Sequence, residues 1–203
     1  VGWDGVTHQG LEDMSIVRCI PNVVIVHPAD AVATRKLLPQ VIEHVGPVYF
    51  RLGRNPTPII YSESDELSLG RANVLTDGSD VAIIACGLMV AESMKAVQML
   101  QVDGIEARLV DMHAVKPLDL ECVIESARLT GAVVTVEDNN VIGGLGSAVA
   151  EVLVERCLVP MERVGIRDCF GESGDPDALF EKYCMSARHI ADAARRVVAR
   201  KGL

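Results

Sequence analysis

The sequence predicts an α/β fold built around a mostly parallel sheet. Runs rich in β-branched residues begin at positions 81, 106, 132 and 162, about 25–30 residues apart, which is the spacing of a β-α-β unit. Segments in which apolar residues recur every three or four positions separate most of these runs, as expected for helices that cover a sheet. The 203 residues suffice for one or two domains with a buried core.

Six strands are expected from short segments rich in apolar and β-branched residues. They are residues 23–27, 48–52, 81–86, 106–110, 132–137 and 162–166. Amphipathic helices are expected between several of these strands and at the end of the chain. The helical segments are residues 90–100, the segment that follows Asp119 as its N-cap, and the segments after Ser147 and Ser186.

A further helix is predicted over residues 30–44, with Ala33, Leu37 and Val41 on one face. Pro39 lies inside this segment, and an interior proline costs a helix about 3 kcal/mol. We therefore expect a kink or an early stop at Pro39.

The chain is expected to divide into two domains joined by a linker. Residues 61–76 and the Gly- and Pro-containing stretch just before them lack periodicity and collect turn-forming residues. Residues 77–203 carry four strands and their helices and form a complete domain. Residues 1–60 carry only two strands and should bury too little apolar area to offset the conformational entropy that they lose on folding. We therefore expect them to belong to a larger domain or to pack against a partner.

Composition excludes several classes of function. The 28 acidic and 19 basic residues give a net charge of −9, which argues against a nucleic-acid partner. The longest uncharged apolar run, residues 81–91, is too short to cross a bilayer, and no basic segment precedes it as in a signal peptide. The six cysteines form no Cys-x-x-Cys pair, which disfavours a zinc or redox motif and favours a cytoplasmic protein with reduced thiols.

The densest polar cluster begins with Asp4-Gly5-Val6-Thr7-His8-Gln9-Gly10. Such a loop, feeding a helix, could present Asp4 and His8 to a polar substrate, and a histidine exchanges protons near neutral pH. The alternative is a capped turn whose histidine is merely exposed. Asp4, His8 and Glu12 have the four-residue spacing of metal ligands on a helix, but the two glycines disfavour a helix there, so no metal site is predicted.

Two arginines, Arg51 and Arg54, flank the end of the strand at 48–52. Ligands gather at the carboxyl ends of strands in parallel sheets, and a guanidinium suits a phosphate. The alternative is one solvated arginine and one ion-paired arginine.

The glycine-rich segment Gly143-Gly144-Leu145-Gly146 follows a predicted strand and opens a helix, which is the setting of a dinucleotide fingerprint. Val149 replaces the third glycine, and Glu137 and Asp138 would repel a pyrophosphate. A tight strand-to-helix turn is the alternative. His113, just after another strand, could line a pocket or belong to a loop that ends in a helix cap.

Several of these motifs, in order along the chain, resemble transketolase. They are residues 4–9 with Glu12 and Asp13, residues 113–119, Glu137 with residues 143–148, and Phe170-Gly171-Glu172-Ser173-Gly174. The resemblance covers essentially the whole chain and is greatest to the C-terminal subunit of split bacterial transketolases. It implies the end of the pyrimidine-binding α/β domain followed by a complete transketolase C-terminal domain. Deoxyxylulose-phosphate synthases and the β subunits of 2-oxoacid dehydrogenases are more distant relatives.

The resemblance implies thiamine diphosphate chemistry, in which a two-carbon ketol unit passes between sugar phosphates. By motif, Asp4 and His8 would contact the hydroxyls of the donor sugar, with His8 assisting proton movement, and Arg54 would hold the substrate phosphate. Arg51 has no clear role. Thiamine diphosphate and Mg²⁺ would be held mainly by segments before residue 1 and by an N-terminal transketolase subunit or domain, in a symmetric homodimer. The chain alone is then expected to be inactive.

Two alternatives remain open at this point. The chain could be a component of a related thiamine diphosphate enzyme, either a deoxyxylulose-phosphate synthase or a 2-oxoacid dehydrogenase. The substrates of the second class lack a sugar phosphate, so Arg54 would then be dispensable. It could also be a non-catalytic module for dimerisation or assembly, in which case His8 would be dispensable.

Overall fold

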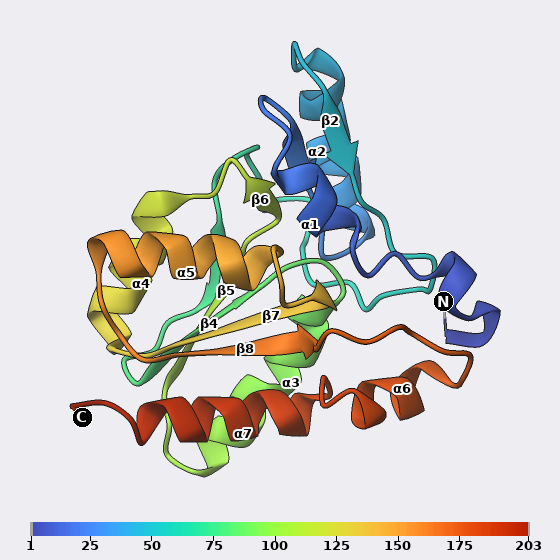
Figure 1. The fold of residues 1–203 in the computed structure, drawn as a ribbon. Helices are drawn as coiled ribbons and strands as arrows, with labels where there is room; N and C mark the ends of the chain where they lie inside the picture. The colour runs from blue at the N-terminus through green and yellow to red at the C-terminus, as the bar shows by residue number, and fades with distance from the viewer. Residues whose placement is uncertain (1, 203) are drawn as a thin grey trace.

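The fold contains two sheets, and the computed structural model describes residues 2–202 (Figure 1). The larger sheet has five strands in the order β3-β5-β4-β7-β8. These strands are Asn73–Thr76 (β3), Ala107–Asp111 (β5), Val81–Ala85 (β4), Val133–Asn140 (β7) and Met161–Ile166 (β8). β4 pairs in parallel with β5 and β7, and β7 with β8, which confirms the predicted mostly parallel α/β fold.

Helices cover both faces of this sheet (Figure 1). α3 (Met89–Val102) and α7 (Ala187–Val198) lie on one face, and α4 (Leu120–Thr130) and α5 (Leu145–Arg156) lie on the other. Alternate residues of β4 feed two separate cores: Ile83 packs with the α3 and α7 side, and Ile84 with the α4 and α5 side. Burial on both faces explains why the strands read as nearly continuous apolar runs.

The smaller sheet has three strands in the order β2-β1-β6. Val24–Val26 (β1) and Val48–Phe50 (β2) pair in parallel, as two of the predicted strands, and Ala114–Lys116 (β6) adds antiparallel to β1. β6 lies far along the chain from β1 and β2, immediately after β5. The later part of the chain therefore completes the sheet that the first 50 residues begin.

Two strands were not expected from the sequence. β6 is only three residues long, and β3 lies within residues 61–76, where it pairs antiparallel with β5 at the edge of the larger sheet. The mixed composition of β3 lacks the alternation of a half-buried strand, so its pairing cannot be read locally.

The helix predicted over residues 30–44 forms as α2 (Ala31–Glu43). It continues past Pro39 to Glu43, so the early stop did not occur. Its N-cap, Asp30, accepts from the amide of Ala33 at 2.7 Å, and also from the amides of Ile60 and Tyr61 at 2.6 and 2.8 Å. Asp30 thus fixes the helix start and the chain beyond β2 at once.

Other helix starts differ slightly from expectation or were not anticipated. α5 begins at Leu145 behind Gly144, not after Ser147, whereas Asp119 caps α4 as predicted. The remaining helices are α1 (Asp13–Arg18), α6 (Pro176–Lys182) and the short 3₁₀ turns η1 (Gly2–Asp4) and η2 (Val6–His8). Over residues 2–202, no helix is both long and apolar enough to cross a membrane.

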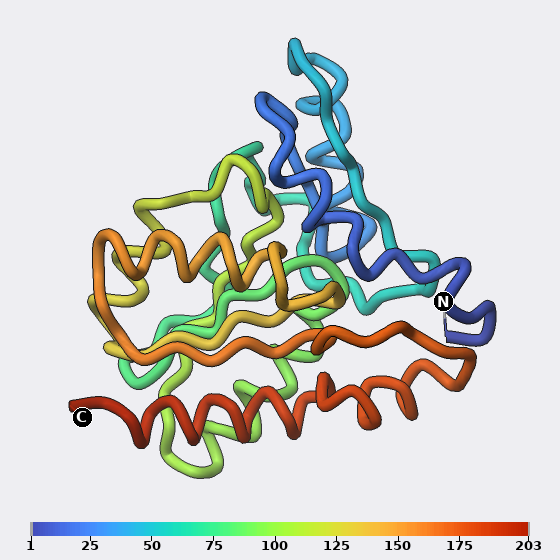
Figure 2. Tube along the Cα trace, in the orientation of Figure 1, coloured from blue at the N-terminus to red at the C-terminus, as the bar shows by residue number. Residues whose placement is uncertain are grey.

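The first residues of the chain lie beside the segment that leads into α6 (Figure 2). The amide of Gly174 donates to the carbonyl of Gly2 at 2.9 Å, across almost the whole length of the chain. The fold therefore brings the Asp4–Gly10 loop against the Phe170–Gly174 segment.

Candidate functional site

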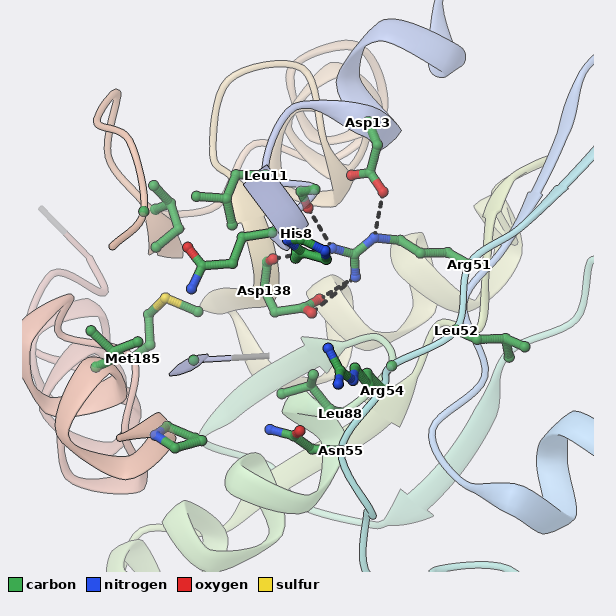
Figure 3. A pocket seen from close by; sticks show the side chains of 18 of the residues that line it. His8, Leu11, Asp13, Arg51, Leu52, Arg54, Asn55, Leu88, Asp138 and Met185 are labelled. Carbon is green, nitrogen blue, oxygen red and sulfur yellow. Dashed lines mark hydrogen bonds and ion pairs between the residues drawn. The ribbon is translucent and has the colours of Figure 1, made fainter. Parts of the chain in front are cut away.

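A cavity of about 470 Å³ lies between the N-terminal loop, the chain that follows β2 and the region of α6 (Figure 3). Its polar wall includes His8, Gln9, Arg51, Arg54 and Asp138. The rest of the lining is largely apolar. It includes Leu88, Leu179, Phe180, Tyr183 and Met185. A concave site with few polar groups on an apolar background is typical of a small-molecule site.

Two of the predicted site residues, His8 and Arg54, line this same cavity. The third, Asp4, forms an ion pair with the Arg54 guanidinium. The Arg54 side chain remains 63% exposed, so its charge is accessible from the cavity. His8 is also exposed, and its Nδ1 lies 3.0 Å from the Thr7 hydroxyl. Their catalytic and binding roles stay predictions.

Arg51 is mostly buried and is the most extensively bonded side chain of the cavity (Figure 3). It donates to Asp13 Oδ2 at 2.8 Å, to both carboxylate oxygens of Asp138 at 2.8 and 2.9 Å, and to the Gly10 carbonyl at 2.7 Å. Its Nη1 also lies 3.1 Å from His27 Nε2, which must accept because a guanidinium only donates. We call Arg51, Asp13, Asp138 and His27 the Arg51 cluster.

The protonation states of the Arg51 cluster follow from its burial. Burial lowers the pKa of His27 to about 4, even though Asp138 lies 3.7 Å away and opposes the shift. Burial alone would raise the pKa of Asp138, but the Arg51 charge outweighs it and the pKa is lowered. Near neutral pH, one guanidinium therefore faces two carboxylates and a neutral imidazole. Arg51 is neutralised and does not serve as an anion site.

The two arginines thus have different environments. The alternative of one solvated and one ion-paired arginine holds in part. Arg51 is ion-paired and shielded, whereas Arg54 is exposed but also paired, with Asp4. An exposed ion pair is weak, so an anionic ligand can replace Asp4 at Arg54 at little cost.

The glycine-rich turn before α5 binds a carboxylate of this chain. The amides of Leu145 and Gly146 donate to Glu137 Oε2 and Oε1, both at 2.8 Å. A Cβ on Gly144 would overlap Glu137 Oε2, so this position requires glycine. The carboxylate occupies the place that a phosphate takes in a dinucleotide fingerprint. The geometry supports the tight-turn alternative and not a nucleotide site.

His113 does not reach the cavity. Its side chain is fully buried, with Nε2 3.1 Å from the Ser68 carbonyl and Nδ1 3.8 Å from Asp111 Oδ2. Tyr61 donates to the same Asp111 oxygen at 2.7 Å. His113 therefore holds the segment around residues 61–68 on the sheet, in agreement with the loop alternative.

Residues 1–59 match the family of the transketolase pyrimidine binding domain, and residues 70–190 match the family of the transketolase C-terminal domain. The chain belongs to the transketolase family. This membership confirms the resemblance that the motifs indicated.

Individual relatives agree. The 6-deoxy-6-sulfo-D-fructose transketolase subunit SqwH of Clostridium sp. (strain MSTE9) is 50% identical over 98% of this chain and 62% of its own length. A putative transketolase C-terminal section of Methanocaldococcus jannaschii is 42% identical over 94% of this chain and 60% of its own length. The chain thus spans about three fifths of the length of these relatives.

Among solved structures, a split gene transketolase described as an inactive beta4 tetramer superposes with a TM-score of 0.94 at 48% identity. The match covers 97% of this chain and 65% of that chain. The transketolase of Leishmania mexicana, at 21% identity and a TM-score of 0.76, shares the fold.

The cavity residues do not by themselves fit thiamine diphosphate with Mg²⁺. Within residues 2–202 no three His, Cys, Asp or Glu side chains converge as metal ligands, and the Arg51 charge is already neutralised by two carboxylates. Arg54 alone is a weak match for a diphosphate, which usually requires a metal ion or several donors. The residues of this transketolase chain are therefore insufficient to hold the cofactor by themselves.

Sequence reasoning missed the role of Asp138, which was seen only as a group that would repel a pyrophosphate. Arg51 and Asp138 are 87 residues apart, so no local pattern joins them. A signal did exist, because each lies at the end of a predicted strand, and the ends of parallel strands can meet at one side of a fold.

Replacing Arg51 by methionine should lower the free energy of unfolding by about 3–5 kcal/mol, because two largely buried carboxylates lose their counter-ion. Urea unfolding followed by circular dichroism measures the change. Arg54→Met is the matched control, with an expected change below about 1 kcal/mol for an exposed ion pair. Equal small losses in both variants would contradict the assigned importance of the Arg51 cluster.

Glu137 predicts a specific pH dependence of stability. Burial raises its pKa to about 7 from 4.5. The folded state then holds a proton that the unfolded state has lost, so this residue's contribution to stability is largest below about pH 4.5. The contribution should decline by about 3 kcal/mol as the pH rises to about 7, at about 1.4 kcal/mol per pKa unit.

The measurement is the difference in unfolding free energy between the unmodified chain and Glu137→Gln at several pH values from 4.5 to 7.5. Glu121→Gln, at a side chain that is 85% exposed, is the matched control for removal of a glutamate. A flat difference for Glu137→Gln would contradict the raised pKa of Glu137.

Proposed function

We propose that this chain is the C-terminal component of a thiamine diphosphate-dependent transketolase that transfers a two-carbon ketol unit between sugar phosphates or similar anionic sugars. One observation carries the proposal: His8 and Arg54, which come from two separate loops, line one cavity. A proton-exchanging group and a cation at one site suit a substrate that has both hydroxyl groups and a terminal anion.

Arg54 would bind the terminal anion of the sugar. It is the exposed guanidinium of the cavity, and Asp4 keeps it oriented before a ligand arrives. When the anion pairs with Arg54, the Asp4 carboxylate is released to accept from a sugar hydroxyl. This exchange gives Asp4 its proposed role beside His8.

His8 would move a proton at a substrate hydroxyl. The Thr7 hydroxyl occupies Nδ1, which leaves Nε2 for the substrate. Because imidazole exchanges protons in the neutral range, His8 can act as base and acid in successive half-reactions.

The cofactor would come with an N-terminal transketolase subunit or domain. Relatives named as transketolase subunits support a divided enzyme, and the similar split gene protein is described as an inactive beta4 tetramer. We further propose that the assembled enzyme is cytoplasmic and built on a symmetric pair of these chains. The pentose phosphate pathway is one setting, but relatives named for sulfofructose and apulose phosphate support a wider range of anionic sugars.

Arg54→Ala in the assembled enzyme should raise the KM for a sugar phosphate by roughly 10- to 100-fold, because a charge-assisted hydrogen bond contributes about 1.5–3 kcal/mol. Steady-state kinetics with donor ketose varied at fixed acceptor gives the value. Arg71→Ala is the matched control, since its side chain is 65% exposed and carries ion pairs outside the cavity. An unchanged KM in Arg54→Ala would show that Arg54 does not bind the terminal anion of the sugar.

The isolated chain should bind thiamine diphosphate only weakly, with a Kd above about 1 mM even when Mg²⁺ is present. The reason is the single accessible guanidinium of the cavity. Isothermal titration calorimetry on this chain measures the affinity. Tight, Mg²⁺-dependent binding would contradict the proposal that the cofactor site lies in other segments.

A further inference from the structure

The loop that carries His8 contacts the Phe170–Gly174 segment, which lies more than 160 residues away in the sequence. Gln9, the residue after His8, donates from Nε2 to the carbonyl of Glu172 at 2.9 Å. The amide of Gly174 donates to the carbonyl of Gly2 at 2.9 Å, on the other side of the same loop. Figure 2 shows these two parts of the chain running side by side.

Glycines allow this close approach. A Cβ on Gly171 would overlap Gln9 Oε1, and a Cβ on Gly5 would lie 2.5 Å from the Ser173 hydroxyl oxygen. The space that accommodates the Gln9 amide therefore exists only because position 171 has no side chain. Gln9 Oε1 is buried there without a hydrogen-bond partner among the described residues, a cost that core packing alone does not explain.

The acceptor of this contact is itself anchored. The Glu172 carboxylate accepts from the Tyr183 hydroxyl at 3.1 Å and pairs with Lys182 at the end of α6. The Phe170 carbonyl lies 3.2 Å from the same hydroxyl, so the two acceptors share its one proton. The 170–174 segment is therefore fixed to α6, which contributes Leu179 and Phe180 to the lining of the cavity.

Two further hydrogen bonds hold the backbone of this loop. The carbonyl of Gly10 accepts from Arg51 at 2.7 Å, and the amide of His8 donates to the Gly5 carbonyl at 3.0 Å. The two residues that follow His8 are thus bonded to separate parts of the fold, Gln9 to the 170–174 segment and Gly10 to the Arg51 cluster.

We propose that Gln9 is a positioning residue for His8, and that its amide, seated against Gly171 and bonded to Glu172, sets where the imidazole stands in the cavity. The inference rests on the proposed function, in which His8 moves a proton at the substrate. A small displacement of such a group costs rate more than affinity, because proton transfer needs a close and aligned approach. Arg54 is on a separate loop, so substrate affinity is largely preserved.

Gln9→Ala and Gly171→Ala test this from the two sides of the contact in the assembled enzyme. Each should lower kcat by about 10-fold or more while the KM for the anionic sugar changes less than about twofold. The loss in His8→Ala sets the upper limit for both. Gln98→Ala, at an exposed glutamine of α3, is the matched control and should leave kcat unchanged.

The double variant gives the sharpest test. In Gln9→Ala the side chain that a Cβ at position 171 would overlap is gone, so adding Gly171→Ala should cost no more than about twofold further. Losses in kcat that simply multiply would show that the two residues act independently, and they would overturn the proposal.

Amide hydrogen exchange of residues 5–10 in this chain provides a readout that does not depend on activity. Exchange should rise in Gln9→Ala and Gly171→Ala and stay unchanged in Gln98→Ala. Unchanged exchange, or an unchanged kcat in an active enzyme, would overturn the positioning role alone. If the unmodified assembled enzyme has no transketolase activity, the proposed function fails instead, and Gln9 positions no proton transfer.

Discussion

The Arg51 guanidinium, bonded to Asp13 and Asp138, is the interaction on which the arrangement of this transketolase chain depends. It joins the start of α1, the end of β2 and the carboxyl-terminal part of β7, and so couples the smaller sheet to the larger one. A charge removed from water is tolerated only where opposite charges and hydrogen bonds replace the water. Each of the three elements supplies one part of that compensation, so none can move alone. β6, which follows β5 in the chain but pairs with β1, adds a second link between the sheets.

This constraint also decides which charges remain for a ligand. Asp13 and Asp138 neutralise the charge of Arg51. Arg54 is then the accessible guanidinium of the cavity, and it forms only an exposed ion pair with Asp4. Arg51 in addition donates to the Gly10 carbonyl and thereby fixes the loop beyond His8. The buried arginine is therefore held entirely by groups of this chain, whereas the exposed one keeps a charge that is accessible from the cavity.

The six strands could be predicted because apolar, β-branched runs are a local property of the sequence, and burial on both faces demands such runs in the central strands β4, β5 and β7. β3 and β6 could not, since their pairing depends on neighbours that sequence alone does not reveal. The same limit applies to Arg51 and Asp138, which are brought together only by the fold. His8 and Arg54 were singled out as candidates from a polar loop and a strand end, and the fold places both in one cavity, whereas Gln9 and Gly171 give no signal until the two loops are seen in contact.

The glycine-rich turn at residues 143–146 shows that a sequence motif alone does not specify which anion it binds. Backbone amides at a helix start favour any anion, and phosphate and carboxylate oxygens satisfy them equally well. Here the chain provides Glu137, and the cost of burying that carboxylate appears as a pKa raised to about 7. The amides are thus taken by a residue of the preceding strand, and the turn ties β7 to α5. Asp138 is the next residue of β7, so a turn that resembles a nucleotide site instead supports the part of the strand that holds Arg51.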